Sequence, residues 1–312
     1  MPSGRAGETG HSMRLADRFS WGSRCYVMGI LNVTPDSFSG DGLGPVDGLA
    51  ARAVDLAARF VDAGADILDV GGESTRPGSS PVGAEEEIAR VVPVVAALAD
   101  RFPGVALSVD TSKAAVAAAA LDSGAGWVND VWALKADPAM APLVAARKVP
   151  VVLMHNRSRP KAVESDPRLG SQYVSARYRH LMDDVAAELA ALAGDAVSAG
   201  VERGQIILDP GIGFGKTVVQ NMALLNHLDR LKALGYPLLI GPSRKSFIGQ
   251  VLDLGPEERD EGTAACVAIG VARGADIVRV HDVKGAVRVA RMVDAIIRSP
   301  ADGASGGSRS RV

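Results

Sequence analysis

Residues 28–39 read MGILNVTPDSFS and join a short apolar run to a cluster of polar and turn-forming residues. The apolar residues 27–31 have the continuous hydrophobic character of a strand that is buried on both faces. Asn32 follows this strand directly, and the Thr-Pro-Asp-Ser sequence two residues later is typical of a turn. Asn32 and Asp36 also carry oxygen atoms of the kind that bind a hard cation such as Mg²⁺. An ordinary strand-to-loop transition would explain any one of these residues equally well.

Apolar runs like this one alternate with Ala-rich amphipathic stretches along the chain. The runs predict strands at residues 25–31, 66–70, 105–109, 126–129, 150–154, 205–209, 237–241 and 276–280. The amphipathic stretches predict helices at residues 47–63, 84–101, 112–123, 138–147, 171–199, 218–234, 259–273 and 282–298. Eight such β-then-α units predict an α/β fold, a single-domain (β/α)8 TIM barrel. An open doubly wound sheet would show a similar pattern, but no glycine fingerprint of the dinucleotide-binding type follows the first strand.

The length and composition suit a barrel of this kind. The 312 residues are 47% hydrophobic and 22% charged, which provides for a large core and argues against bulk disorder. With 34 basic and 36 acidic residues and a net charge of −2, we expect no nucleic-acid partner. No apolar stretch reaches the roughly 18 residues needed to span a bilayer, so we expect no membrane partner either.

The cysteines and the chain ends indicate a compartment and a domain boundary. Cys25 and Cys266 lie far apart without metal-ligand spacing, which favours free thiols in a reducing cytoplasm. The N-terminus has no apolar signal core, so nothing in it points to export. Residues 1–20 and 299–312 lack periodicity, so we expect flexible tails on a catalytic domain of residues 21–298.

In a (β/α)8 barrel the chemistry collects at the carboxyl ends of the strands, which share one face. Polar or glycine-rich residues follow all eight predicted strands: Asn32, residues 71–78 (GGESTRPG), Asp110, Asn129, Met154 with His155, Asp209 followed by PGIGFGK, residues 241–246 (GPSRKS), and Arg279 with His281. Each has a structural alternative, since Asp110, for example, could cap the helix that follows it. Their coincidence at so many strand ends favours one functional site.

One group of these side chains suits a planar heterocycle. Asp110, Asn129 and Asp209 offer acceptors and an amide to the amino and ring N–H groups of such a ring. Lys245 can donate to a ring carbonyl or nitrogen, and Met154 can lie against the face of the ring.

A second group suits phosphate. Arg76, Arg279 and His281 supply donors and positive charge of the kind that bind phosphate oxygens. The two groups together predict a pocket for a heterocycle tied to an anionic group, with a metal ion near the first strand. A structural alternative remains, in which Arg279 and His281 pair with Asp282 or Asp36.

The ordered motifs carry a resemblance to a known family. They read MGILNVTPDSFS, DVGGESTRPG, SVDTS, ND, LDPGIGFGKT, GPSRKSFIG and RVHD, and they extend over residues 26–298. In this order and spacing they resemble the dihydropteroate synthase family of pterin-binding enzymes. The resemblance implies a (β/α)8 barrel that acts as a homodimer with Mg²⁺. It also implies a condensation of 6-hydroxymethyl-7,8-dihydropterin diphosphate with 4-aminobenzoate, which gives 7,8-dihydropteroate and pyrophosphate in folate biosynthesis.

The resemblance assigns roles residue by residue. Asn32 matches the metal ligand of the family, and the pterin contacts match Asp110, Asn129, Asp209 and Lys245. Arg279 and His281 match the anion-binding pair at the last strand. The residues expected around 4-aminobenzoate are Thr75, Arg76 and Pro77 on a mobile loop, Ser246 near the carboxylate, and Phe38 and Phe214 beside the ring. The residues expected to act in catalysis are Arg76, Asp110, Lys245, Arg279 and His281.

Two segments depart from the family pattern, and two other functions remain open. Residues 128–138 read VNDVWALKADP, where the bulky Trp132 replaces a small turn residue. Residues 155–173 (HNRSRPKAVESDPRLGSQY) are either a variable surface loop, which we favour, or an element at the rim of the pterin site. A pterin-dependent methyltransferase domain would share the barrel without needing STRPG, SRKS and RVH. A non-catalytic pterin-binding paralogue would be expected to have lost one of Asn32, Arg76, Lys245 or His281.

Overall fold

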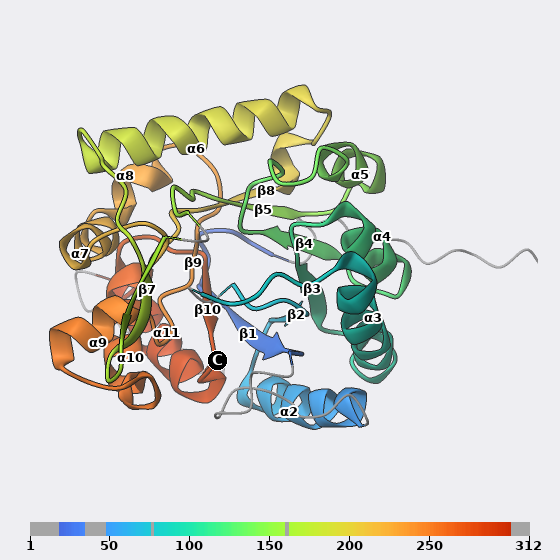
Figure 1. Ribbon diagram of the computed structural model, residues 1–312. Coiled ribbons are helices and arrows are strands. Elements are labelled where there is room, and N and C mark those ends of the chain that lie inside the picture. Colours follow the sequence, from blue (N-terminus) through green and yellow to red (C-terminus); the bar gives the residue numbers. More distant parts are fainter. Residues whose placement is uncertain (1–18, 35–47, 76–77, 160–161, 301–312) are drawn as a thin grey trace, which may run out of the picture.

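Eight parallel strands close into a ring at the centre of the molecule (Figure 1). The computed structural model describes residues 19–34, 48–75, 78–159 and 162–300. The strands are β1 (Tyr26–Asn32), β2 (Ile67–Gly71), β3 (Ala106–Asp110), β4 (Trp127–Asp130), β5 (Val151–Met154), β8 (Ile206–Asp209), β9 (Leu239–Ile240) and β10 (Ile277–Val280). Their order is β8-β5-β4-β3-β2-β1-β10-β9, and a parallel bridge between Leu208 and Leu238 closes the ring. The predicted (β/α)8 TIM barrel is confirmed.

Helices surround this ring and cover its outer face (Figure 1). They are α2 (Leu49–Ala63), α3 (Ala84–Arg101), α4 (Ala114–Asp122), α5 (Met140–Arg147), α6 (Leu181–Ser198), α7 (Val218–Asn226), α8 (Leu228–Lys232), α9 (Ser246–Leu252), α10 (Asp260–Ala272) and α11 (Val283–Ile297). Two short 3₁₀ turns, at Arg203–Gln205 and Pro256–Glu258, precede β8 and α10. Among the described residues, no helix has the length and apolar character that crossing a membrane requires.

Two helix predictions need correction, and one helix was missed. The helix expected from residue 171 begins only at Leu181, because residues 170–173 form a strand instead. The helix expected over residues 218–234 is divided, because His227 has φ −119° and ψ 28°, outside the helical region. Helix α9 was not predicted at all, since its seven residues are too few to show a clear apolar period.

A two-stranded antiparallel hairpin lies between β5 and α6. It consists of β6 (Val163–Asp166) and β7 (Gly170–Tyr173), and Figure 1 shows it to the left of the strands β9 and β10, in front of α10. We expected a variable surface loop in this segment. That interpretation is wrong, because β7 packs against α9 and contributes residues to the central cavity described below.

The interior of the barrel is filled at its amino-terminal end by one layer of apolar side chains. Each strand contributes to this layer, whose members are Tyr26, Met28, Ile67, Ala106, Trp127, Val152, Ile207, Leu239 and Ile277. Phe19 seals it from below, with its ring 4.9 Å from the ring of Tyr26 and 5.2 Å from that of Trp127. Phe19 therefore belongs to the barrel, although it falls in the range expected as a tail.

Candidate active site

A second inward layer follows directly from the alternation of side chains along a strand. Residues two positions beyond the apolar layer point to the same side of each strand. These residues are Ile30, Asp69, Ser108, Asn129, Met154, Asp209, Gly241 and Arg279. The interior thus changes from apolar to polar within two residues along the barrel axis, and the polar end is the carboxyl end of the strands.

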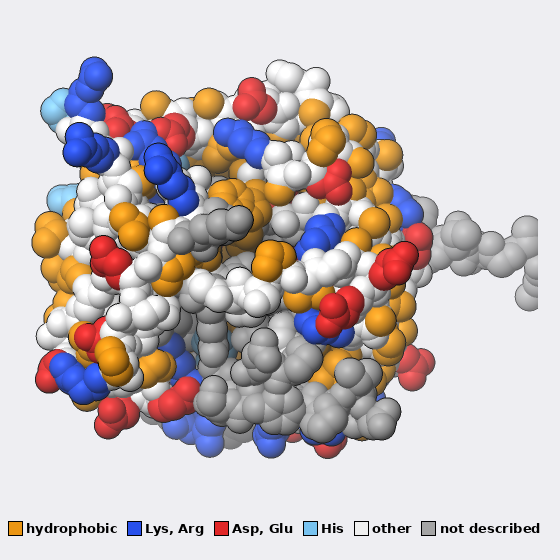
Figure 2. Space-filling view, in the orientation of Figure 1, with side chains coloured by type: hydrophobic (Ala, Val, Ile, Leu, Met, Phe, Trp, Pro, Cys, Tyr) orange, Lys and Arg blue, Asp and Glu red, His pale blue; other side chains and the backbone are white. Residues whose placement is uncertain are grey.

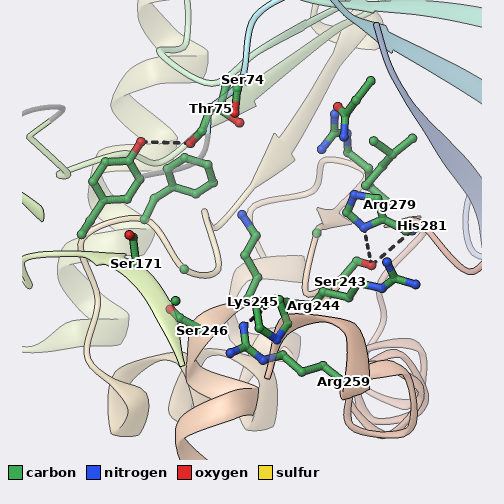
Figure 3. Close-up of a pocket in the computed structure, with 18 of the residues that line it drawn as sticks. Ser74, Thr75, Ser171, Ser243, Arg244, Lys245, Ser246, Arg259, Arg279 and His281 are labelled. Atoms are coloured by element: carbon green, nitrogen blue, oxygen red, sulfur yellow. Dashed lines mark hydrogen bonds between the residues drawn. The ribbon is translucent and has the colours of Figure 1, made fainter. Parts of the chain in front are cut away.

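A cavity of about 330 Å³ opens above this layer. The predicted site residues that line it are Asn32, Thr75, Asp110, Phe214, Lys245, Ser246, Arg279 and His281. Asn129, Met154 and Asp209 are buried on neighbouring strand ends and do not line it. Figure 3 shows Lys245 extending between the side that carries Thr75 and the side that carries Arg279 and His281. Arg76, Pro77 and Phe38, like Asp36, lie outside the described residues.

A buried network of charged and polar side chains joins four strands (β2, β3, β4 and β10) at the floor of the cavity. Arg279 donates from Nε to Oδ2 of Asp69 and from Nη2 to Oδ2 of Asp110, both at 2.6 Å. Asn129 donates from Nδ2 to the same Asp69 oxygen at 3.0 Å. Asp69 has no solvent exposure, and its other oxygen has no hydrogen-bond partner among the described residues.

This network excludes two structural alternatives. Asp282 does not pair with Arg279, because its carboxylate caps α11 and accepts the Gly285 N–H at 3.0 Å. Asp110 does not cap the following helix, because α4 begins at Ala114 after Lys113 and has no side-chain cap. Asp110 instead points into the cavity.

Burial makes the carboxylates of the site unusually basic. Burial raises the pKa of Asp209 to about 6, although the Gly211 N–H and the charge of Lys245 lower it. Burial also raises the pKa of Asp110, and the neighbouring Arg279 counteracts this rise. The reverse holds for the guanidinium of Arg279: burial lowers its pKa, the two carboxylates raise it, and the net direction is upward. The buried carboxylates of Asp110 and Asp209 are therefore strong hydrogen-bond acceptors, which donors from a ligand would stabilise.

The loop after β8 is organised around a buried lysine. Lys216 donates from Nζ to the carbonyl oxygens of Gly211 at 2.9 Å and Phe214 at 3.1 Å, and it lies 3.2 Å from Nδ1 of His155. Burial lowers the pKa of Lys216 to about 7, and burial together with the lysine charge lowers the pKa of His155 to about 3. A neutral His155 can then accept from the ammonium. Lys216 thus holds the loop in the shape that presents Phe214 to the cavity.

The loop between β9 and α9 contributes the ammonium of Lys245 and the hydroxyl of Ser243 to the wall of the cavity. Ser243 Oγ lies 2.9 Å from Nδ1 of His281 and accepts the backbone N–H of the same residue at 3.1 Å. Arg244 has φ 53°, in the left-handed region, and its N–H donates to Thr263 Oγ1 at 3.0 Å. This turn places Lys245 so that its Nζ lies 4.2 Å from the centre of the Phe214 ring, a cation–π contact.

The turn after β4 is held by a carboxylate and stays outside the cavity. Asp130 accepts the N–H groups of Trp132 and Leu134, both at 2.8 Å, and Leu134 has φ 66°. Trp132 does not line the cavity. The departure from the family pattern at this turn therefore leaves the cavity wall unaffected.

Several residues of the site were missed by the sequence analysis. Asp69, Tyr173 and Arg259 belong to the cavity or its network and were not assigned to the site, whereas Glu73 and Ser243 line the cavity within the predicted stretches 71–78 and 241–246 but were given no role of their own. Only the positions after each strand were considered, whereas Asp69 lies within β2. Side chains alternate along a strand, so Asp69 faces the barrel interior as Ile67 does, and this alternation would have identified it. Nothing in the local sequence around Tyr173 signals its place.

The residues present are compatible with Mg²⁺ bound jointly by protein and substrate. A β-carbon added at Gly71 would lie 3.9 Å from Oδ1 of Asn32 and 3.7 Å from Oδ2 of Asp110, so both oxygens border the same small space. In the described part of the chain, no group of three or more His, Cys, Asp or Glu side chains could form a protein-only metal cage. Mg²⁺ commonly takes few protein ligands and completes its shell with water and phosphate oxygens.

Comparison with known proteins agrees with this geometry. The family model "Pterin binding enzyme" matches residues 28–281. A dihydropteroate synthase of Bacillus subtilis is 49% identical over 278 residues, which cover 89% of this chain and 90% of that protein. A crystal structure of the Clostridium difficile dihydropteroate synthase in the presence of pteroic acid has a TM-score of 0.80 and 44% identity, and the match covers 90% of this chain and 100% of that one. The Xanthomonas albilineans enzyme with 4-aminobenzoic acid has a TM-score of 0.79 and 40% identity, over 91% and 97% of the two chains. The chain therefore belongs to the dihydropteroate synthase family of pterin-binding enzymes.

Proposed function

We propose that the polar inward layer binds the pterin and that the mouth of the cavity binds 4-aminobenzoate. The activity is that of the family: the enzyme condenses 6-hydroxymethyl-7,8-dihydropterin diphosphate with 4-aminobenzoate and releases pyrophosphate. The observation that carries the assignment is the set of buried acceptors beside Arg279. In the proposed complex Asp110, Asn129 and Asp209 receive the amino and ring N–H groups of the pterin. Lys245 donates to its ring, and Met154 packs against the ring face.

The proposed 4-aminobenzoate subsite lies between the loop after β2 (residues 72–78), called the second loop below, and the start of α9. Thr75, Phe214 and Ser246 border this part of the cavity. Phe214 would take the ring, and Ser246 would donate to the carboxylate. Arg76, Pro77 and Phe38 complete the proposed subsite from outside the described residues. The Xanthomonas albilineans structure, which contains 4-aminobenzoic acid, supports a site for this substrate in the family.

In the proposed mechanism, bond cleavage forms a cation and an anion, and different residues stabilise each of them. Breaking the C–O bond to the diphosphate leaves a pterin methyl cation, which the carboxylates of Asp110 and Asp209 stabilise. Arg279 and His281, with Arg76 on its loop, bind the departing diphosphate. A guanidinium has five donors, so Arg279 can hold both carboxylates and still donate to a phosphate oxygen. The aniline nitrogen then attacks the cation to form the C–N bond and loses one proton to the released pyrophosphate, while the surrounding loops exclude water that would capture the cation.

We propose that Asn32 holds Mg²⁺ together with diphosphate oxygens and water. A bound Mg²⁺ would neutralise charge on the leaving diphosphate. Asn32 supplies a neutral amide oxygen, so the substrate provides most of the anionic ligands. Metal affinity should therefore be low until the diphosphate is present.

We propose a homodimer formed through the helices on one side of the barrel. Large apolar side chains are exposed on the neighbouring helices α7, α10 and α11, among them Met222, Ile269 and Met292. An apolar surface of this kind marks an interaction site in many proteins. Ile269→Glu should shift the sedimentation coefficient towards that of a monomer, whereas an unchanged coefficient would argue against this interface.

We propose that the enzyme acts in the cytoplasm. Cys25 is buried and Cys266 is partly buried, and both are free thiols. Free thiols persist where glutathione and thioredoxin keep proteins reduced.

The function is tested by measuring pyrophosphate release from pterin diphosphate with and without 4-aminobenzoate. Release that depends on 4-aminobenzoate, with dihydropteroate formed in equal amount, is the expected result. A non-catalytic paralogue would bind the pterin without releasing pyrophosphate. A pterin-dependent methyltransferase domain would bind a methylated pterin and ignore 4-aminobenzoate.

A further inference from the structure

The hairpin of β6 and β7 forms part of the wall of the cavity. Gly170, Ser171 and Tyr173 of β7 line the cavity, whereas Glu164 and Ser165 of β6 are exposed. In Figure 3 Ser171 is drawn on the same side of the cavity as Thr75 and Ser246. The hairpin therefore presents one strand to the proposed 4-aminobenzoate subsite and the other to solvent.

Tyr173 connects the loop after β2 to the loop after β8. Its ring stacks on that of Phe214, with centroids 5.7 Å apart and planes inclined by 26°. Its hydroxyl donates to the carbonyl oxygen of Thr75 at 2.9 Å, the bond that a dashed line marks at Thr75 in Figure 3. Phe214 belongs to the glycine-rich loop after β8, and Thr75 belongs to the second loop.

The hairpin is anchored to the barrel, so Tyr173 is held in place. Arg259 is 3% exposed and donates to the carbonyl oxygens of Leu169 at 2.8 Å, Leu254 at 3.1 Å and Arg244 at 3.0 Å. One guanidinium thereby ties the hairpin turn to the loop that carries Lys245. Arg168 adds a bond to the carbonyl oxygen of Asp253 at 2.9 Å. An anchored hairpin can position its neighbours, which a freely moving loop cannot.

We propose that Tyr173 is a positioning residue for 4-aminobenzoate, acting through Phe214 and Thr75. This inference rests on the proposed location of the 4-aminobenzoate subsite. The stacked ring fixes the orientation of Phe214, and the hydroxyl fixes the end of the second loop. The proposed pterin contacts Asp110, Asn129 and Asp209 lie at strand ends, whereas the ring and hydroxyl of Tyr173 contact Phe214 and Thr75. Tyr173 should therefore affect the second substrate and leave the first unaffected.

Two substitutions separate the contributions of the ring and the hydroxyl. Tyr173→Phe keeps the stacking and removes only the bond to Thr75, so KM for 4-aminobenzoate should rise about 3- to 10-fold. Tyr173→Leu removes both, and KM should rise about 10- to 50-fold. In both variants kcat should stay within about twofold, because the reacting groups keep their contacts.

The matched control is Tyr236→Phe. Its hydroxyl accepts from Nη1 of Arg203 at 2.5 Å, and Tyr236 does not line the cavity. This variant loses a phenol hydroxyl without touching the subsite, so its KM for 4-aminobenzoate should equal that of the wild type. A second readout is the affinity for a pterin without diphosphate, measured by calorimetry. This affinity should be the same in all three variants as in the wild type.

The outcomes distinguish the inference from the proposed function. A graded rise of KM with unchanged pterin affinity supports the role of Tyr173. An unchanged KM in Tyr173→Phe and Tyr173→Leu, or a pterin affinity weakened as much as KM, overturns it while leaving the activity intact. If Tyr173→Leu does not fold, Tyr173→Phe decides alone. A wild-type enzyme that forms no dihydropteroate overturns the function itself.

Discussion

Asp69 offers the sharpest test of how the floor of the cavity works. This buried carboxylate accepts from Nε of Arg279 at 2.6 Å and from Nδ2 of Asn129 at 3.0 Å with the same oxygen. Asp69→Asn keeps the shape of the side chain and removes its charge. The substitution leaves Arg279 with Asp110 as its one carboxylate partner among the described residues.

The expected loss of stability follows from the contacts that change. A hydrogen bond between charged partners contributes about 1.5–3 kcal/mol, and the neutral amide retains part of this. The introduced amide nitrogen also occupies the position of Oδ1, which has no partner. We therefore expect a loss of about 2 kcal/mol in the free energy of unfolding, or a fall of about 4–8 °C in Tm.

The expected loss of activity is larger than the loss of stability suggests. Arg279 is aimed by its two carboxylates, and a weaker hold on one side lets the guanidinium rotate away from the diphosphate. A misplaced group of this kind lowers kcat/KM by about 100-fold. The assays are thermal unfolding followed by circular dichroism and pyrophosphate release at saturating 4-aminobenzoate.

Asp276→Asn is the matched control at the opposite end of the barrel. Asp276 is 2% exposed and accepts the N–H of Leu238 at 2.8 Å and that of Gly22 at 3.1 Å. It precedes β10, far from the carboxyl ends of the strands, so its loss should lower Tm by a similar amount and leave kcat/KM unchanged. If Asp69→Asn destabilised the enzyme as Asp276→Asn does and kept full turnover, Asp69 would have a structural role only.

Three further predictions concern substrates and metal. Asp209→Asn should weaken calorimetric binding of a pterin without diphosphate by about 30- to 1000-fold, because a donor replaces an acceptor that faces ring N–H groups. In the wild type this affinity should fall as the pH drops through about 6, because burial raises the pKa of Asp209 to about 6 and the carboxylate takes up a proton there. An identical pH profile in the variant would assign the titration to another group. Exhaustive chelation should abolish turnover and added Mg²⁺ should restore it, so full activity in chelator would exclude the metal role of Asn32. Sulfonamides should raise the apparent KM for 4-aminobenzoate without changing kcat, and purely uncompetitive inhibition would contradict a shared subsite.

The eight barrel strands were predictable because each is a continuous buried run that is followed by polar or glycine-rich residues. Every predicted strand lies within two residues of its observed bounds, as for residues 25–31 against Tyr26–Asn32 and residues 237–241 against Leu239–Ile240. A short continuous apolar run is typical of a parallel strand that is buried on both faces. The same polar residues after the strands pointed to the cavity, because a barrel brings all its carboxyl ends to one face.

The hairpin and the charge network were not predictable for different physical reasons. β6 and β7 read VESD and GSQY, which alternate too weakly to indicate a strand. Their pairing depends on tertiary contacts such as that of Arg259 with Leu169. Asp69 was overlooked because only the residues after each strand were considered, although the alternation along β2 places it inward. Its pairing with Asn129 and Arg279, which are 60 and 210 residues away in the chain, follows only from the barrel register.

The glycine-rich loop after β8 restricts how this enzyme could become resistant to inhibitors. Gly211 has φ 69°, and a β-carbon there would lie 2.0 Å from the carbonyl oxygen of His155. Gly215 has φ 63°, and its β-carbon would lie 2.8 Å from the backbone nitrogen of Ser158. Backbone atoms cannot move aside as side chains do, so a larger residue at either position would disrupt the loop. Resistance substitutions should therefore arise in the second loop or the hairpin, and inhibitors that draw their affinity from the backbone of residues 211–215 should be the hardest to escape.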